Sequence, residues 1–303
     1  MRSSTVISLK VVWRYPRSSL SQRVLKTSSL STLVRVLMFA EELRRTFTRP
    51  RNLVILGLIG LVPILLGVVV KTLGVGHGGG GPPFFGQITD NPVFLVLVAL
   101  STMQTFLLPL LIGLVAGDSV AGEASSGSLR YLVAAPAGRV RIIAIKTLVV
   151  MLFTLAAVLT IALTGGITGS LLFHVGKIVT LSGSVVSNAR GVVLTIEAAL
   201  TVGVSMFSVV GLGLFVSTLT DTPAAASAVA VGVAIITEIL GGIPQLVHVQ
   251  PILLSTYWSS FTDLMRTPQV WHGVGRDVLE SFGWLAVTVI AGAVNFAKKD
   301  LLS

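Results

Sequence analysis

The sequence of 303 residues contains no cysteine and little charge. Without cysteine there are no disulfides, thiolate metal sites or cysteine nucleophiles, and the absence says little about cellular compartment. Charged residues make up 11% of the chain, whereas soluble domains have about 25%. Hydrophobic residues reach 53%, with a mean hydropathy of +0.91. A chain of this length cannot bury that much apolar surface in one soluble core, so the composition predicts a membrane protein.

The motifs of several catalytic classes are also missing from the sequence. It has no GxxxxGK[ST] loop for ATP, because Gly176-Lys177 is followed by Ile178, and it has neither HExxH nor GxSxG. It shows no nucleic-acid recognition motif and no aromatic platform. The chain itself is therefore expected to carry no catalytic site, cofactor or metal and to bind no nucleic acid. The four histidines are scattered, at positions 77, 174, 248 and 272.

Hydropathy predicts an all-α membrane protein with six transmembrane helices. A bilayer core of about 30 Å needs roughly 20 apolar residues in a helix. The third apolar run continues to Gly176, about 50 Å at helical rise, so Gly165-Gly166 is expected to end the part of that helix buried in the membrane or to permit a bend. The segment 244–280 is expected to form short interfacial or re-entrant helices on the outer side. The predicted spans are 53–70, 93–116, 142–166, 192–217, 224–243 and 281–297.

Lysine and arginine predict the orientation of the chain. With six spans both termini share one side, and that side holds seventeen of the 22 basic residues. Eleven of them lie in 1–52, which has only Glu41 and Glu42 as acids. The positive-inside rule therefore predicts that both termini are cytoplasmic. The polar segment 117–146 is then a cytoplasmic loop.

The N-terminal region divides into a basic tail and a helix. Residues 1–30 are expected to be a cytoplasmic tail that contacts anionic lipid headgroups. Two alternatives stay open: the acid-free composition, rich in Ser and Arg, is typical of a mitochondrial presequence, and translation could begin at Met38. In 33–47 apolar residues recur at steps of three or four, which predicts an amphipathic helix in the inner interface. Pro50 is expected to end that helix.

The loop "GDSVAGEASSGSLRYLVAAPAGRVRIIAIK" lies between two strongly apolar stretches. Asp118 is expected to cap a following helix, because a charged residue does not remain in lipid without a reason. A Pro/Gly break and a basic return ending at Lys146 follow. The segment is too organised for a passive linker and is expected to be a rigid knob that another protein holds. The candidate contact residues are Asp118, Glu123, Gly127, Leu129, Arg130, Pro136 and Arg139.

Taken together, these features resemble the permease subunit of ABC-2 type bacterial ABC transporters. The similarity covers about 31–303 and includes "PRN" at 50–52, "PILLSTYWSSFTDLM" at 251–265 and "NFAKKDL" at 295–301. Ser128 departs from the family, in which threonine is common there, and 124–126 lack the charge often found there. Within the loop, the matching positions are Asp118, Glu123, Gly127, Leu129, Pro136, Arg139 and Lys146.

The resemblance implies a function. Residues 31–303 would be a six-helix transmembrane domain in the bacterial cytoplasmic membrane, paired with a second copy or a sister permease. Two separate ATP-binding cassette subunits would bind ATP and Mg and would grip 118–138 as a coupling helix, with 218–223 as a smaller contact. The apolar interior favours export of an amphipathic compound such as a drug or lipid. The alternatives are an ion-coupled secondary transporter, a membrane enzyme and a non-transporting scaffold.

Two acids and two glycine pairs lie inside the predicted spans. Glu197 and Glu238 are each about five residues, some 8 Å, from the outer end of a span. They either hydrogen-bond a neighbouring helix or line a pathway that favours cationic amphiphiles. The small-residue spacings Gly113/Gly117 and Gly165/Gly169 allow close helix approach, and packing within one chain is the preferred interpretation.

Overall fold

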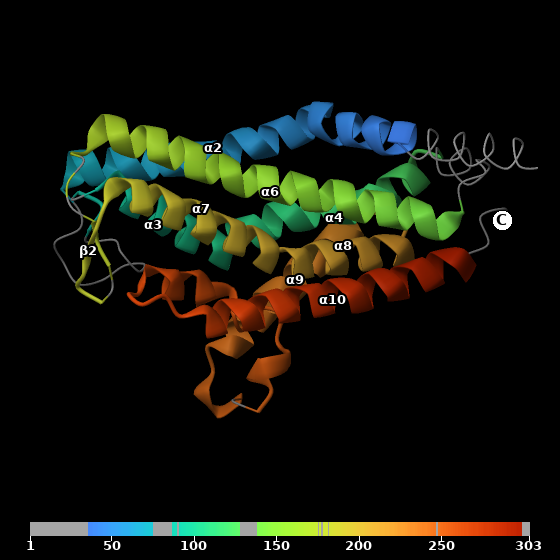
Figure 1. Ribbon diagram of the computed structural model, residues 1–303. Helices are drawn as coiled ribbons and strands as arrows, with labels where there is room; N and C mark the ends of the chain where they lie inside the picture. The colour runs from blue at the N-terminus through green and yellow to red at the C-terminus, as the bar shows by residue number, and fades with distance from the viewer. Residues whose placement is uncertain are drawn as a thin grey trace, which may run out of the picture.

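The computed structural model describes residues 36–74, 87–89, 91–127, 138–174, 176, 178–180, 182–246 and 248–298. In this part of the chain, long helices run lengthwise beside one another and form a single bundle (Figure 1). Six helical segments are long and apolar enough to cross a membrane, which confirms the predicted all-α membrane fold. The helices are α2 (Pro50–Leu73), α3 (Pro92–Thr105), α4 (Leu107–Ser125), α6 (Arg139–Leu172), α7 (Asn188–Ser205), α8 (Phe207–Leu219), α9 (Pro223–Gly241) and α10 (Trp271–Lys298).

Short elements connect some of the helices. Between α6 and α7 a two-residue antiparallel ladder joins β1 (Ile178–Val179) to β2 (Val185–Val186). Between α9 and α10 lie three short 3₁₀ helices: η2 (Pro244–Leu246), η3 (Gln250–Ile252) and η4 (Trp258–Met265). The prediction of short helices in this segment is confirmed for 244–265. In Figure 1 part of this segment projects below the bundle.

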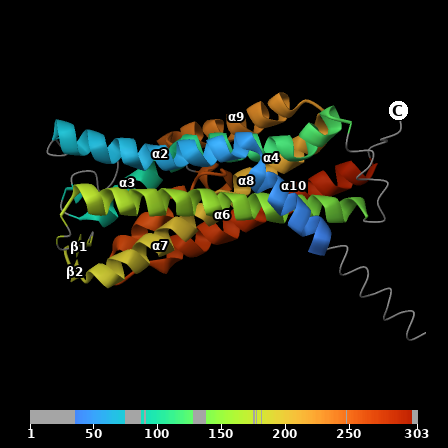
Figure 2. The same ribbon diagram turned by 90° about the horizontal axis from the view of Figure 1, so that it is seen from above.

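A helix over 36–48 precedes α2, which confirms the predicted amphipathic helix. Residue 49 separates it from α2, and α2 begins at Pro50, whose missing N–H is tolerated in a first helical turn. The helix is set at an angle to α2 and crosses α6 (Figure 2). The predicted tail over 1–30 lies outside the described residues.

The second and fourth predicted spans are each broken into two helices. Phe106 separates α3 from α4, and Met206 separates α7 from α8. The second span was also expected to end at residue 116, whereas α4 continues to Ser125. Asp118 therefore lies inside a helix, and the prediction that it caps the next one was wrong.

Two further predicted boundaries were wrong. α6 is one helix of 34 residues that continues through Gly165-Gly166. A glycine in a helix costs only about 1 kcal/mol, and a Cβ on Gly165 would lie 3.1 Å from the side chain of Val96 on α3, so the glycine serves packing rather than termination. α10 begins at Trp271, ten residues before the predicted sixth span, so 271–280 belong to the last helix.

The glycine pairs pack helices of the same chain against each other, as preferred. A Cβ on Gly117 would lie 2.7 Å from the backbone nitrogen of Ser227, and one on Gly113 would lie 3.0 Å from Val231, so α4 and α9 are in close contact. Gly169 approaches the backbone of Pro92 in the same way. These contacts confirm internal packing and fix the register of antiparallel α4 and α9.

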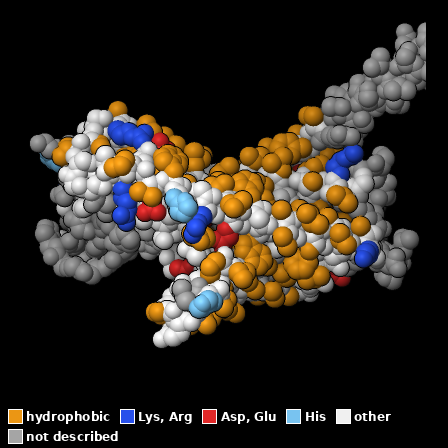
Figure 3. All heavy atoms as spheres, turned by 60° about the horizontal axis from the view of Figure 1, so that its bottom comes forward, with side chains coloured by type: hydrophobic (Ala, Val, Ile, Leu, Met, Phe, Trp, Pro, Cys, Tyr) orange, Lys and Arg blue, Asp and Glu red, His pale blue; other side chains and the backbone are white. Residues whose placement is uncertain are grey.

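The outer surface of the bundle is apolar, as expected for contact with lipid. Large hydrophobic side chains are exposed along α2, α6, α7 and α10, where a soluble protein would carry charge. Figure 3 shows hydrophobic side chains over much of one face, with Lys and Arg gathered toward its two ends. The same distribution is expected for a membrane protein whose charged residues lie in the interfaces.

Candidate functional site

Charged residues from four segments meet where the helix over 36–48, the start of α2, the end of α4 and the start of α6 come together. This group is called here the basic-end cluster. Most of its ion pairs join residues that are distant in sequence, such as Arg51 with Asp118, 67 positions apart, and Lys146 with Glu42, 104 positions apart. Its members are Glu42, Arg45, Arg49, Arg51, Asp118, Glu123 and Lys146.

Asp118 is held by two arginines from the start of α2. Its Oδ2 accepts hydrogen bonds from Nη1 of Arg49 at 3.0 Å and from Nη2 of Arg51 at 2.7 Å. The two cations offset the cost of placing a carboxylate beside apolar helices. This pairing explains why α4 does not stop at Asp118.

Lys146 is the most buried charge of the cluster. Its side chain is 2% exposed, and its Nζ lies 2.8 Å from Oε1 of Glu42 and 2.8 Å from Oε1 of Glu123. The side chain of Glu123 is itself 3% exposed, and Arg45 lies 3.8 Å from it. One ammonium thus joins the N-terminal helix, α4 and α6. Because a buried charge without its partner is costly, these three segments are expected to move together.

A serine from α8 fixes the same stretch of α4 from another side. Ser217 Oγ donates to the carbonyl of Gly117 at 2.6 Å and accepts from the backbone nitrogens of Val120 and Ala121. The hydroxyl therefore replaces part of the hydrogen-bonding of α4. The last two turns of α4 are held by α2 and α6 through charge and by α8 through this serine.

α4 ends at Ser125, so it contains the first eight residues of the expected contact segment 118–138. Gly127 has φ +70, a left-handed conformation that favours glycine and is typical of the residue after a helix. Leu129, Arg130 and Pro136 lie outside the described residues, and Arg139 is the first residue of α6. Residues 128–137 therefore join two helices that the basic-end cluster holds together.

The topology agrees with a comparison to known families. The family model of the ABC-2 family transporter proteins matches residues 15–301 of the chain. The chain belongs to this family. No individually curated protein matches it. The resemblance drawn from the sequence is confirmed, and the protein is an ABC-2 type permease.

The two candidate pathway acids of this permease lie in different surroundings. Glu197 on α7 accepts from Arg190 at 3.3 Å and from Nε2 of Gln269 at 2.9 Å, so its charge has local partners. Glu238, near the end of α9, lines a cavity to which α7 contributes none of the described residues. Glu197 and Glu238 therefore do not line one common cavity, and the hypothesis of a shared pathway at equal depth is not supported by the geometry.

Two further acids of the permease were not singled out from the sequence. Asp277, on α10, is 1% exposed and accepts hydrogen bonds from Ser205 at 2.6 Å, Ser260 at 3.3 Å and Ser281 at 3.4 Å. Both carboxylate oxygens of Glu280 are buried and have no hydrogen-bond partner among the described residues. Their spacing of three on a stretch with many apolar residues was a usable signal, but 271–280 had been interpreted as an outer segment.

Proposed function

We propose that the permease is driven by separate ATP-binding cassette subunits that grip the segment between α4 and α6. The observation that carries the proposal is the buried pairing of Lys146 with Glu42 and Glu123. The ion pairs join the two helices that flank the segment and attach both to the N-terminal helix. A force on 128–137 would thus reach two transmembrane helices and the N-terminal helix at once, which a passive loop does not require.

The roles of the individual residues differ in this proposal. Leu129, Arg130 and Pro136, together with the exposed end of α4 at Gly127, contact the ATPase. Asp118, Glu123 and Lys146 hold α4 and α6 to α2 and the N-terminal helix, so they act as positioning residues. The loop 218–223, between α8 and α9, would be a second and smaller contact.

The proposed assembly contains two permease chains and two ATP-binding subunits, with ATP and Mg bound in the latter. The described Lys and Arg residues of 36–51 and 138–146 lie at the basic end, which supports a cytoplasmic location for both termini. A multi-pass protein of the bacterial cytoplasmic membrane follows from this proposal. Its cargo is proposed to be an amphipathic compound, because the helices offer mostly apolar surface, and its direction is export.

Copurification of the ATPase tests the proposal. The tagged permease is isolated from native membranes, and the associated chains are identified by sequence and by ATP hydrolysis. The expected result is a partner that carries GxxxxGK[ST], present in equal number to the permease. A Gly/Ser replacement of 128–137 should abolish this association and leave membrane insertion unchanged.

The matched control is a Gly/Ser replacement of 75–86, the glycine-rich connection between α2 and α3 on the other side of the membrane. This replacement changes a segment of similar length, and the variant should retain the ATPase. Equal retention of the ATPase by both variants would remove 128–137 as the contact. A complex with one permease per ATPase pair would contradict the proposed stoichiometry.

A further inference from the structure

A cavity of about 400 Å³ lies at the level where α3 ends. The last turn of α3, the last turn of α9 and the segment 250–262 line it. Its rim includes the exposed residues Thr105, Gly242 and Ser259, so it opens to the surface of the bundle. Its lining is rich in hydroxyl and amide groups, although the helices around it are mostly apolar.

The helix register explains why this cavity contains an acid. Because Gly117 faces Ser227 and Gly113 faces Val231, the antiparallel pairing brings Glu238 to the level of Phe106, where the second span is broken. Gln104 is about 18 Å along the helix from the start of α3 at helical rise, and α4 extends about 28 Å the other way. The cavity is therefore well inside the length of the bundle.

Two of the side chains that line this space carry a buried donor without a partner among the described residues. The side chains of Gln104 and Trp258 are on residues that are 3% and 4% exposed, and both line the cavity. Nε2 of Gln104 and Nε1 of Trp258 have no hydrogen-bond partner among the described residues. A buried N–H without an acceptor is unfavourable, so both atoms call for an acceptor that the chain itself does not supply.

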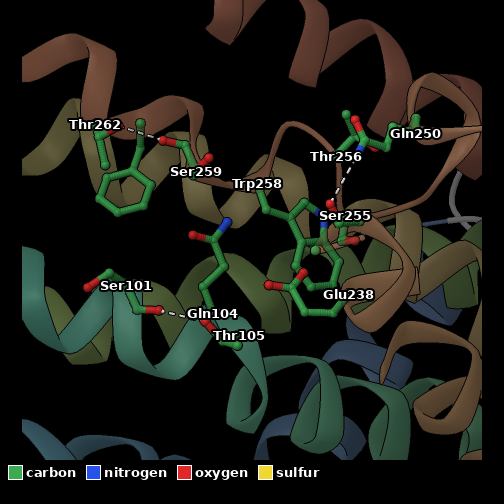
Figure 4. A pocket seen from close by; sticks show the side chains of 13 residues that line it. Ser101, Gln104, Thr105, Glu238, Gln250, Ser255, Thr256, Trp258, Ser259 and Thr262 are labelled. Carbon is green, nitrogen blue, oxygen red and sulfur yellow. Dashed lines mark hydrogen bonds between the residues drawn. The ribbon is translucent and has the colours of Figure 1, made fainter. Parts of the chain in front are cut away.

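Glu238 has the opposite need, since a carboxylate requires a donor or a cation and not an acceptor. Its carboxylate is hydrogen-bonded to the side chain of Ser255, and Figure 4 shows it directed toward the same space as Gln104 and Trp258. None of the described cavity-lining residues is Lys or Arg, and no ion pair among the described residues includes Glu238. A carboxylate in such surroundings favours a cationic donor.

We propose that this cavity binds a small organic ammonium compound that carries a hydrogen-bond acceptor, such as a carbonyl, next to the cationic nitrogen. The ammonium group pairs with Glu238, and the acceptor satisfies Gln104 and Trp258. One ligand of this class supplies the acceptor that Gln104 and Trp258 lack and a cation for Glu238. As a statement about cargo the inference rests on the proposed transport function, whereas binding itself does not require an ATPase.

Three probes of similar size separate the two requirements. L-Phenylalanine amide has the ammonium group and the carbonyl, 2-phenylethylamine has only the ammonium group, and 3-phenylpropanamide has only the amide. Titration calorimetry on the purified full-length permease in lipid nanodiscs measures saturable binding of each. L-Phenylalanine amide is expected to bind at least tenfold more tightly than either of the others, since charge-assisted and neutral hydrogen bonds contribute together.

Variants assign the two contacts. Glu238→Gln keeps the shape of the side chain and should weaken L-phenylalanine amide at least tenfold, with little effect on 3-phenylpropanamide. Gln104→Leu removes one unpaired donor. It should weaken the binding of L-phenylalanine amide and leave the binding of 2-phenylethylamine unchanged. The matched control is Glu197→Gln, because Glu197 is an acid on α7 that lies outside the cavity. This variant should bind all three probes as the unaltered chain does.

The outcomes are distinguishable from those of the ATPase experiment. Equal or non-saturable binding of the three probes to the unaltered chain would overturn the proposed binding site. This test uses only the unaltered chain, so it does not depend on the folding of any variant. The same loss in Glu197→Gln as in Glu238→Gln would also overturn it. Because the permease is tested alone, loss of the ATPase contact would not alter these results.

Discussion

The first prediction concerns Lys146, the buried cation that joins three segments at the basic end. Lys146→Met keeps the length of the side chain and removes the charge. It leaves the carboxylates of Glu123 and Glu42 close together, with Glu123 only 3% exposed. Breaking a buried ion pair costs about 3–5 kcal/mol, and the nearby Arg45 offsets part of this, so a loss of about 3 kcal/mol is expected.

The loss can be measured as a shift in thermal stability. For a chain of this length 1 kcal/mol corresponds to roughly 2 °C, so Lys146→Met should lower the midpoint by about 6 °C. Purified protein in detergent is heated for a fixed time, and the remaining monodisperse fraction is measured by size-exclusion chromatography. A fixed heating time matters because unfolding of such proteins is irreversible.

The control for Lys146 is Arg51→Met in the same cluster. Arg51 is half exposed and Asp118 keeps Arg49, so an exposed pair worth at most about 1 kcal/mol is lost, or about 2 °C. Adding Glu123→Gln to Lys146→Met removes the unpaired acid and should restore part of the stability. A midpoint for Lys146→Met that is no lower than that of Arg51→Met would refute the assignment of Lys146 as the central buried charge.

Two further predictions use the same heating assay. Gly117→Ala should lower the midpoint of thermal inactivation by several degrees, because the new Cβ would lie 2.7 Å from the backbone of Ser227. The control Gly57→Ala adds a Cβ with no atom within 4 Å and should leave the midpoint unchanged or raise it. Equal effects of the two substitutions would contradict the packing of α4 on α9. Asp277→Ala removes the acceptor of three serine hydroxyls, at a cost of about 1–3 kcal/mol. This variant should be less stable than Asp277→Asn, which keeps one acceptor oxygen. The reverse order of stability would show that these hydrogen bonds do not stabilise the fold.

Hydropathy and periodicity predicted the features that depend on local sequence. The six apolar segments, the amphipathic helix before α2 and the end of that helix before Pro50 all follow from composition within a window of about 20 residues. The family resemblance was likewise carried by short motifs in order. These predictions did not require knowledge of any contact between distant residues.

The predictions that failed depend on partners far away in the sequence. The second span was ended too early because Asp118 looked unpaired, but Arg49 and Arg51 neutralise it. The last helix was started too late because 271–280 was assigned to the outer segment, but inside the bundle Ser205 and Ser260 hydrogen-bond to Asp277. Hydropathy assigns each acid its own cost and cannot include a compensating group from another helix.

The proposed cavity and the basic-end cluster are connected by one element of the fold. α4 begins beside the cavity, after the break at Phe106, and ends in the cluster about 28 Å away. Along this length it packs closely on α9, whose other end carries Glu238. A movement of α4 along its axis would change its position relative to the end of α3, and the break at Phe106 allows that change without stretching a continuous helix. In the proposed mechanism α4 is therefore the physical link between the ATPase contact and the ligand site, and an unbroken second span would make this link stiffer.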